Sequence, residues 1–267
     1  MADLIFIKTL IAASLAGAGC GLIGVFIYLM NIPFIGVAIA HSAMAGGIWG
    51  VIFGFPAKAS AYFAALLSSV IIGPVADKSK AGANITLSII FSFVMGLAFM
   101  GVGLIEGKNR LVMNFLWGNI LLADYPDMVM MAAILFLTTA IIIIFYKQYS
   151  AMLFNREIAA SLGINDRLFY YLILALIGAV ITVNLDTIGG LMLFSIIITP
   201  PAIAYQFTFD LKKFFLLSAV TGALGSGMGV AIAFAFNLPV SATVVIFMTL
   251  VFFTVSVLSP KRLKYGQ

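Results

Sequence analysis

His41 is the side chain of this sequence best suited to binding a metal ion in apolar surroundings. It lies in an apolar run at 34–55, and the interiors of the nine apolar runs of the chain contain no Asp, Glu, Lys or Arg. A neutral imidazole has one nitrogen lone pair that binds a divalent metal, or it hydrogen-bonds a carbonyl of a neighbouring helix. Because an ionisable group is costly in such surroundings, its isolation favours a functional role.

The segment 153–164, LFNREIAASLGI, is a second candidate, because its apolar residues recur at helical spacing. Glu157 near its start suits the helix dipole and Gly163 suits a carboxyl-terminal cap, so we expect one short surface helix. Its apolar stripe fits a groove of a partner protein, and the alternative is an ordinary solvated loop helix. The residues predicted to dock are Phe154, Asn155, Arg156, Glu157, Ile158, Ala159, Ala160, Leu162 and Gly163.

Pro200 and Pro201 are a third candidate, since they stand inside an apolar run at 187–207. Proline lacks an N–H group and interrupts the helical hydrogen bonds, so we expect a kink there. The kink either opens carbonyls toward a pathway or shapes the bundle.

The composition indicates an integral membrane protein that positions these residues. Of the 267 residues, 64% are hydrophobic and 9% are charged, whereas soluble domains have about 45–50% and about 25%. The mean hydropathy is +1.21. The single cysteine, Cys20, excludes a disulfide framework and a cysteine metal cluster. We therefore predict an all-α, polytopic membrane helix bundle that forms one domain over residues 1–267 and binds no nucleic acid.

The apolar runs predict nine membrane spans, with eight as the alternative, because about 20 residues suffice for a helix to cross a bilayer. The step Asn31-Ile32-Pro33 separates the first two runs, since proline restricts the residue before it. A short apolar stretch at 114–122 is expected at the interface. The runs lie at 9–30, 34–55, 59–76, 83–104, 127–146, 168–185, 187–207, 214–236 and 239–259.

Basic residues indicate the orientation, because cytoplasmic loops are enriched in Lys and Arg. In the nine-span arrangement ten basic residues fall on the side of the carboxyl terminus and four oppose them, which places the amino terminus outside and the carboxyl terminus in the cytoplasm. Acidic residues of the outer side form an entry vestibule or are solvated loop charges: Glu106, Asp124, Asp127 and Asp186.

Four segments together resemble the permeases of ABC importers for zinc, manganese or iron. Residues 157–163 are similar to the EAA loop of ABC importer permeases. Residues 36–46 (GVAIAHSAMAG) resemble the Gly-Asp-x-Leu-Ser/Ala-His-Ala…Gly segment of the metal-ion permeases. Residues 190–204 (GLMLFSIIITPPAIA) and 237–243 (NLPVSAT) resemble two further segments of that family, so the similarity covers essentially the whole chain.

This resemblance implies a transport subunit that is not itself an enzyme. In that family two permease copies and two ATPase subunits form an importer, fed by an extracytoplasmic metal-binding lipoprotein in a prokaryotic plasma membrane. ATP would bind to the partner subunit, this chain would hold no cofactor, and a divalent metal would be the cargo. The 153–164 helix would then contact the ATPase, and His41 would contact the ion.

The main departure from the family pattern is Val37, which stands where the family has an aspartate four residues before the histidine. An Asp and a His at that spacing would share a helix face and offer an oxygen and a nitrogen to the ion. A pathway poor in carboxylates favours zinc over manganese. Smaller departures are Pro201 for alanine, Asn237 for aspartate, Ser241 for glycine, and Met30-Asn31 for an arginine pair.

Three other functions compete with this one. An importer for a metal chelate would use Ile35, Ile39 and Met44 to line an apolar route. A secondary carrier driven by an ion gradient is disfavoured, because such carriers bury carboxylates at mid-membrane. A membrane scaffold without a pathway would leave His41 and Pro200 as packing residues.

Overall fold

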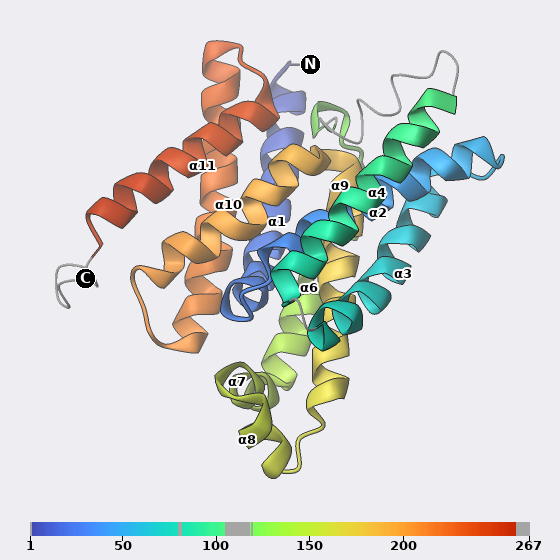
Figure 1. Ribbon diagram of the computed structural model, residues 1–267. Coiled ribbons are helices and arrows are strands. Elements are labelled where there is room, and N and C mark those ends of the chain that lie inside the picture. The colour runs from blue at the N-terminus through green and yellow to red at the C-terminus, as the bar shows by residue number, and fades with distance from the viewer. Residues whose placement is uncertain (1, 80–81, 105–117, 119, 260–267) are drawn as a thin grey trace.

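The computed structural model describes residues 2–79, 82–104, 118 and 120–259, and this part of the chain contains helices and no strand (Figure 1). The first four helices are α1 (Ala2–Leu29), α2 (Pro33–Ile52), α3 (Ala57–Lys78) and α4 (Ala83–Leu104). The break predicted at Asn31-Ile32-Pro33 is confirmed, because α2 begins at Pro33 and Asn31 adopts a positive φ of 53°. Proline suits the first helical turn, where its missing N–H is not needed.

The second half of the chain contains η1 (Ile120–Leu122), α6 (Tyr125–Ile144), α7 (Tyr146–Phe154), α8 (Arg156–Ser161), α9 (Asp166–Tyr205), α10 (Leu211–Phe236) and α11 (Val240–Val257). Most of the stretch expected at the interface, 114–122, lies outside the described residues, as does Glu106. Eight helices of the described residues are long and apolar enough to cross a membrane. The predicted all-α membrane bundle is therefore confirmed.

Helix α9 consists of two helical segments that meet at Gly189. It has 40 residues, and Gly189 has φ 77° and ψ 160°, the only non-helical backbone within the element. A residue with a side chain rarely adopts this conformation, whereas glycine does so readily. In Figure 1 the later part of α9 runs in a different direction from its first part. The sequence placed a boundary between the 168–185 and 187–207 runs, and the structure places it at Gly189.

The core lies between α1, α9 and α2, whereas α4, α6 and α11 are peripheral. About two thirds or more of the apolar windows of α1, α2 and α9 are buried, against 17–22% for α4, α6 and α11. The peripheral helices expose large side chains such as Phe93, Phe136 and Phe253. Exposed apolar surface of this kind suits a helix that faces lipid or a second membrane subunit.

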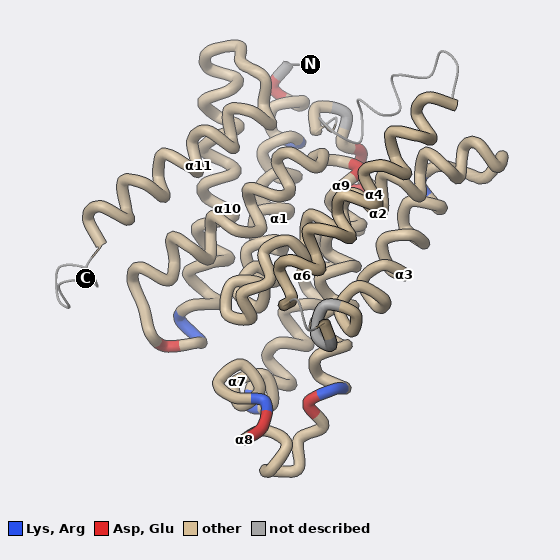
Figure 2. Tube along the Cα trace, in the orientation of Figure 1, with Lys and Arg blue, Asp and Glu red and all other residues tan. Residues whose placement is uncertain are grey.

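Charged residues gather at the two ends of the bundle (Figure 2). Basic segments at α8 and at the starts of α9 and α10 lie at one end, together with the α7–α8 pair. The amino terminus lies at the opposite end (Figure 1). This arrangement agrees with the charge asymmetry on which the predicted orientation rests.

Small residues let the central helices approach closely. A Cβ at Gly17 in α1 would collide with the carbonyl of Gly222 in α10, and the reverse also holds. Gly21 lies against the backbone of Ser218, whose hydroxyl donates a 2.6 Å hydrogen bond to the Gly21 carbonyl. Close backbone contact and a buried hydrogen bond are the main sources of attraction between helices in lipid.

We predict that Gly17→Ala destabilises the protein by about 1–3 kcal/mol, the usual cost of forcing an extra carbon into a packed interface. The measurement is the melting temperature of the purified protein in detergent. Gly96→Ala in α4 is the matched control, because no atom lies within 4 Å of the new methyl group. Equal melting temperatures for the two variants would contradict this account of the α1–α10 contact.

Candidate functional site

His41 lies in the middle of α2, and one nitrogen of its ring forms a hydrogen bond within that helix. Its Nδ1 is 2.8 Å from the Val37 carbonyl oxygen, one turn earlier in the same helix. Since a carbonyl only accepts, Nδ1 carries the proton in this arrangement, and the lone pair of the neutral ring is on Nε2. The ring of Phe91 in α4 meets the imidazole edge-on at 5.0 Å. The hydrogen bond thus orients Nε2 as a potential metal ligand.

Val37 and His41 are half-buried on one face of α2, whereas Ile35, Ile39 and Met44 are core residues. The chelate alternative assigned those three apolar residues to a route through the protein. Their exposed fractions are 1%, 0% and 3%, so they pack against other helices in this structure. In this structure the three side chains are therefore core residues.

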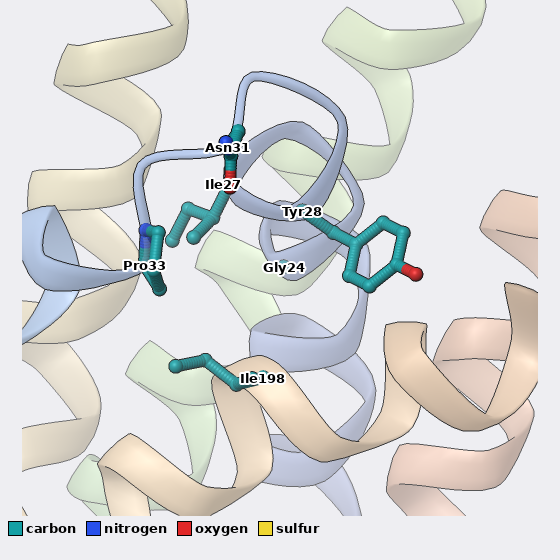
Figure 3. Close-up of a pocket in the computed structure, with 6 residues that line it drawn as sticks. All are labelled: Gly24, Ile27, Tyr28, Asn31, Pro33 and Ile198. Carbon is teal, nitrogen blue, oxygen red and sulfur yellow. The ribbon is translucent and has the colours of Figure 1, made fainter. Parts of the chain in front are cut away.

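A cavity of about 390 Å³ opens beside the turn between α1 and α2 (Figure 3). Ile198 from α9 lies opposite the residues of α1 and the turn in this view. His41 is eight residues after Pro33, about 12 Å farther along α2. The lining residues are Gly24, Ile27, Tyr28, Asn31, Pro33 and Ile198.

Pro200 and Pro201 are buried, and neither is among the residues that line this cavity. Helical backbone angles continue through both prolines, and the non-helical backbone of α9 lies at Gly189. Each proline removes the donor for a carbonyl four residues earlier, at Ile196 and Ile197. The Ile197 carbonyl rests against Gly24 so closely that a Cβ there would collide with it.

A second pocket, on the other side of His41 along α2, is closed. It has no room for a water molecule, and Ala43, Ala61, Thr182 and Leu185 are among its walls. Lys58 in α3 lies at its edge, with Nζ 2.8 Å from Asp186 in α9 and 3.1 Å from Asp127 in α6.

The Lys58 contacts join three helices through one ammonium group. Sequence reasoning placed Asp127 and Asp186 on the outer side and missed their shared partner. The available signal was that Lys58 is one of four basic residues that oppose the charge asymmetry. Asp124 has a different role: its backbone N–H lies 3.4 Å from Asp127 at the start of α6.

Within the described residues, no group of three or more His, Cys, Asp or Glu side chains is arranged to hold a metal ion. His41 is therefore not part of a cluster of three or more such ligands within a single copy of that part of the chain. Asp127 and Asp186 have carboxylates that could bind a metal ion, but in this structure both form ion pairs with Lys58.

The segment 153–164 is divided into two helices, unlike the single helix expected. Helix α7 ends at Phe154, and extended backbone at Asn155 separates it from α8. The Asn155 side chain caps α8 by accepting from the backbone N–H groups of Glu157 (2.8 Å) and Ile158 (3.1 Å). Gly163 ends the helix with φ 79°, as its predicted capping role requires.

Most residues predicted to dock point outward, and two do not. The predicted stripe is exposed: Phe154 by 83%, Ile158 by 47% and Leu162 by 69%. Ala159 is buried, and Arg156 turns toward α9.

Tyr149 fixes the preceding helix, α7, to the bundle. It is fully buried and meets the rings of Phe26 in α1 and Phe169 in α9 edge-on. Burial raises the pKa of its hydroxyl to about 12, so the side chain stays neutral.

Comparison with known proteins matches nearly the whole chain. A family model described as the ABC 3 transport family matches residues 2–259. The manganese transport system membrane protein MntC of Listeria innocua is 29% identical over 255 residues, covering 96% of this chain and 91% of that protein. A probable iron transport system membrane protein of Haemophilus influenzae is 26% identical, covering 96% and 90%.

A solved structure agrees with this match. PsaBC from Streptococcus pneumoniae, in complex with Fab, superposes with a TM-score of 0.83 at 27% identity, covering 97% of this chain and 92% of that chain.

We predict that Lys58→Met lowers the melting temperature by a few degrees. Each partly exposed ion pair contributes about 0.2–1 kcal/mol, and the substitution leaves two carboxylates facing each other without a cation. Differential scanning fluorimetry of the purified protein measures the change. Lys147→Met is the control, because that side chain is exposed outside the membrane spans. Asp127→Asn in the Lys58→Met background should recover part of the loss, and an unchanged Lys58→Met melting temperature would contradict the role of the contact.

Proposed function

The chain belongs to the ABC 3 transport family, and from this premise we propose that it is the membrane permease of an ATP-driven importer for a divalent transition metal, with manganese as the first candidate. The full-length similarity carries this proposal. Of the two relatives compared above, the Listeria innocua protein is named for manganese transport and the Haemophilus influenzae protein for iron transport. ATP hydrolysis would reside in a separate chain, so this subunit would contribute passage rather than catalysis.

Zinc stays a second candidate because of the surroundings of His41. Manganese prefers oxygen ligands, whereas imidazole nitrogen suits zinc. In this chain Val37 provides no carboxylate at the place where the family pattern has one, and Nε2 is the free ligand atom of α2. The metal ion is cargo in either case, and His41 would contact it in passage.

The working unit would contain two permease copies, two ATPase subunits and an extracytoplasmic metal-binding lipoprotein. A single imidazole binds a metal weakly, and two-fold symmetry would supply a second His41 without any further residue. ATP binding would bias the permease between two states, one open to each side of the membrane. The exposed stripe of Phe154, Ile158 and Leu162 would meet the ATPase.

We further propose that the chain crosses a prokaryotic plasma membrane nine times as one domain. A straight helix of 40 residues would be about 60 Å long, twice the roughly 30 Å of the hydrocarbon core. The break at Gly189 lets α9 cross twice. The amino terminus would then lie outside, and α8 and the carboxyl terminus would lie in the cytoplasm.

Metal accumulation in starved cells tests the function. Cells that express the complete transporter should accumulate manganese, or zinc for the second candidate, when six transition metals are measured by mass spectrometry. His41→Ala should reduce accumulation by about tenfold or more. Replacing a residue that only supports a metal ligand already costs about tenfold or more in metal affinity or activity, and His41 is proposed as the ligand itself. Ser42→Ala, which removes a buried hydroxyl from the next position, should transport normally. If no metal rises with the wild-type protein, the importer proposal is wrong.

Val37→Asp tests the choice between the two metals. A carboxylate one turn before His41 would add an oxygen ligand on the same half-buried face, so the ratio of manganese to zinc accumulated should rise. Val37→Asn controls for polarity without charge. An unchanged ratio would mean that this face of α2 does not select the ion.

A further inference from the structure

Arg156 is the one charged residue of the predicted docking segment whose side chain turns into the bundle. Its guanidinium donates a 3.0 Å hydrogen bond to Asp166 at the start of α9, forming an ion pair in which both side chains are about one third exposed or less. The same guanidinium lies over the ring of Tyr170, 4.7 Å from its centre. Arg156 thus holds α8 against the first turn and a half of α9.

Tyr170 extends this connection to a third helix. Its hydroxyl donates a 3.2 Å hydrogen bond to the Gly73 carbonyl of α3, and the whole side chain is buried. At Gly73 the two helices are in close contact, because a Cβ there would collide with Leu174 of α9. Gly178 meets Ser69 in the same way one turn farther along α9. The lower parts of α3 and α9 therefore form one closely packed unit.

The opposite end of this unit is also tied. Lys58, at the start of α3, binds Asp186 near the end of the first segment of α9. Between Asp166 and Asp186 the helix rises about 30 Å, the thickness of the hydrocarbon core. The paired helices α3 and α9 are therefore tied together from the base of α9, near α8, to the closed pocket beside Lys58.

We propose that Arg156 is the residue through which movement of α8 is transmitted to the α3–α9 pair. This inference rests on the proposed function, in which an ATPase moves α8. The exposed stripe would bind the partner, whereas Arg156 would pass the displacement inward. A planar guanidinium performs both contacts at once, since it pairs with a carboxylate in its plane and stacks on an aromatic ring through its face. Lysine preserves the charge but not this geometry.

The first test uses the permease alone and needs no ATPase. Nitroxide labels at Ser161→Cys in α8 and Val75→Cys in α3, with Cys20→Ala removing the native thiol, report the distance between the two helices by pulsed electron resonance. Both labelled positions are exposed. The distance distribution should be narrow, and Arg156→Ala should broaden it. An equally narrow distribution in Arg156→Ala would overturn the proposal.

The second test measures coupling in the complete transporter, in liposomes supplied with Mn²⁺. Arg156→Ala should still co-purify with the ATPase but lose about tenfold in metal uptake per ATP hydrolysed, within the usual range of coupling between sites. Arg156→Lys should recover only part of it. Arg167→Ala, a neighbouring exposed arginine, is the control and should behave as wild type. Loss of ATPase binding in Arg156→Ala would instead make Arg156 a docking residue and overturn the proposal.

Partner substitutions separate the two contacts of Arg156. The losses in uptake per ATP caused by Asp166→Asn and by Arg156→Ala should be non-additive in the double variant. Either substitution alone already removes the Arg156–Asp166 contact, so the second has little left to remove. Tyr170→Phe keeps the ring beneath the guanidinium and removes the hydrogen bond to Gly73, so it should broaden the label distances less than Arg156→Ala. Additive losses for Arg156 and Asp166 would contradict the proposal. A wild-type complex without metal-dependent uptake would refute the proposed function, while the label distances would still decide the role of Arg156.

Discussion

The lack of water in the bilayer core is the constraint on which this structure depends. Every backbone N–H and C=O group within the hydrocarbon must find a partner in the protein, so the spanning segments are helices. Where the chain departs from a regular helix, the protein covers the exposed groups. The Ile197 carbonyl, deprived of its donor by Pro201, rests against Gly24, and the break at Gly189 lies against Gly118. Glycine provides the necessary space in both cases.

The same constraint determines which features the sequence could predict. Long apolar runs have one stable solution in lipid, so the helices at 33–52, 83–104 and 211–236 follow closely from hydropathy. Proline and asparagine marked the turn before α2. These are local patterns, and their physical cause acts within a few residues of the chain.

Features that depend on contacts between distant residues could not be predicted in this way. The segment 153–164 is divided at Asn155, which caps α8, and the preceding helix α7 is held to the bundle by Tyr149, whose ring meets Phe26 and Phe169. The contact with Phe26 joins residues far apart in the chain. Lys58 likewise gave only the signal of a basic residue on the less basic side, because its two carboxylate partners are 69 and 128 positions away. Pairing of that kind requires the packing of three helices.

The candidate site shows how strongly position changes the meaning of a residue type. His41 and Arg156 are both polar residues whose side chains contact other helices, yet their arrangements differ. His41 uses one nitrogen to bind its own helix and leaves the other as a ligand atom, so it is suited to a transient contact with an ion. Arg156 is bound on both its edge and its face by α9, so it is suited to holding two helices together. An importer needs both properties. A metal ion must be released after it is bound, whereas a movement at the cytoplasmic helices must be passed to the helices that span the membrane.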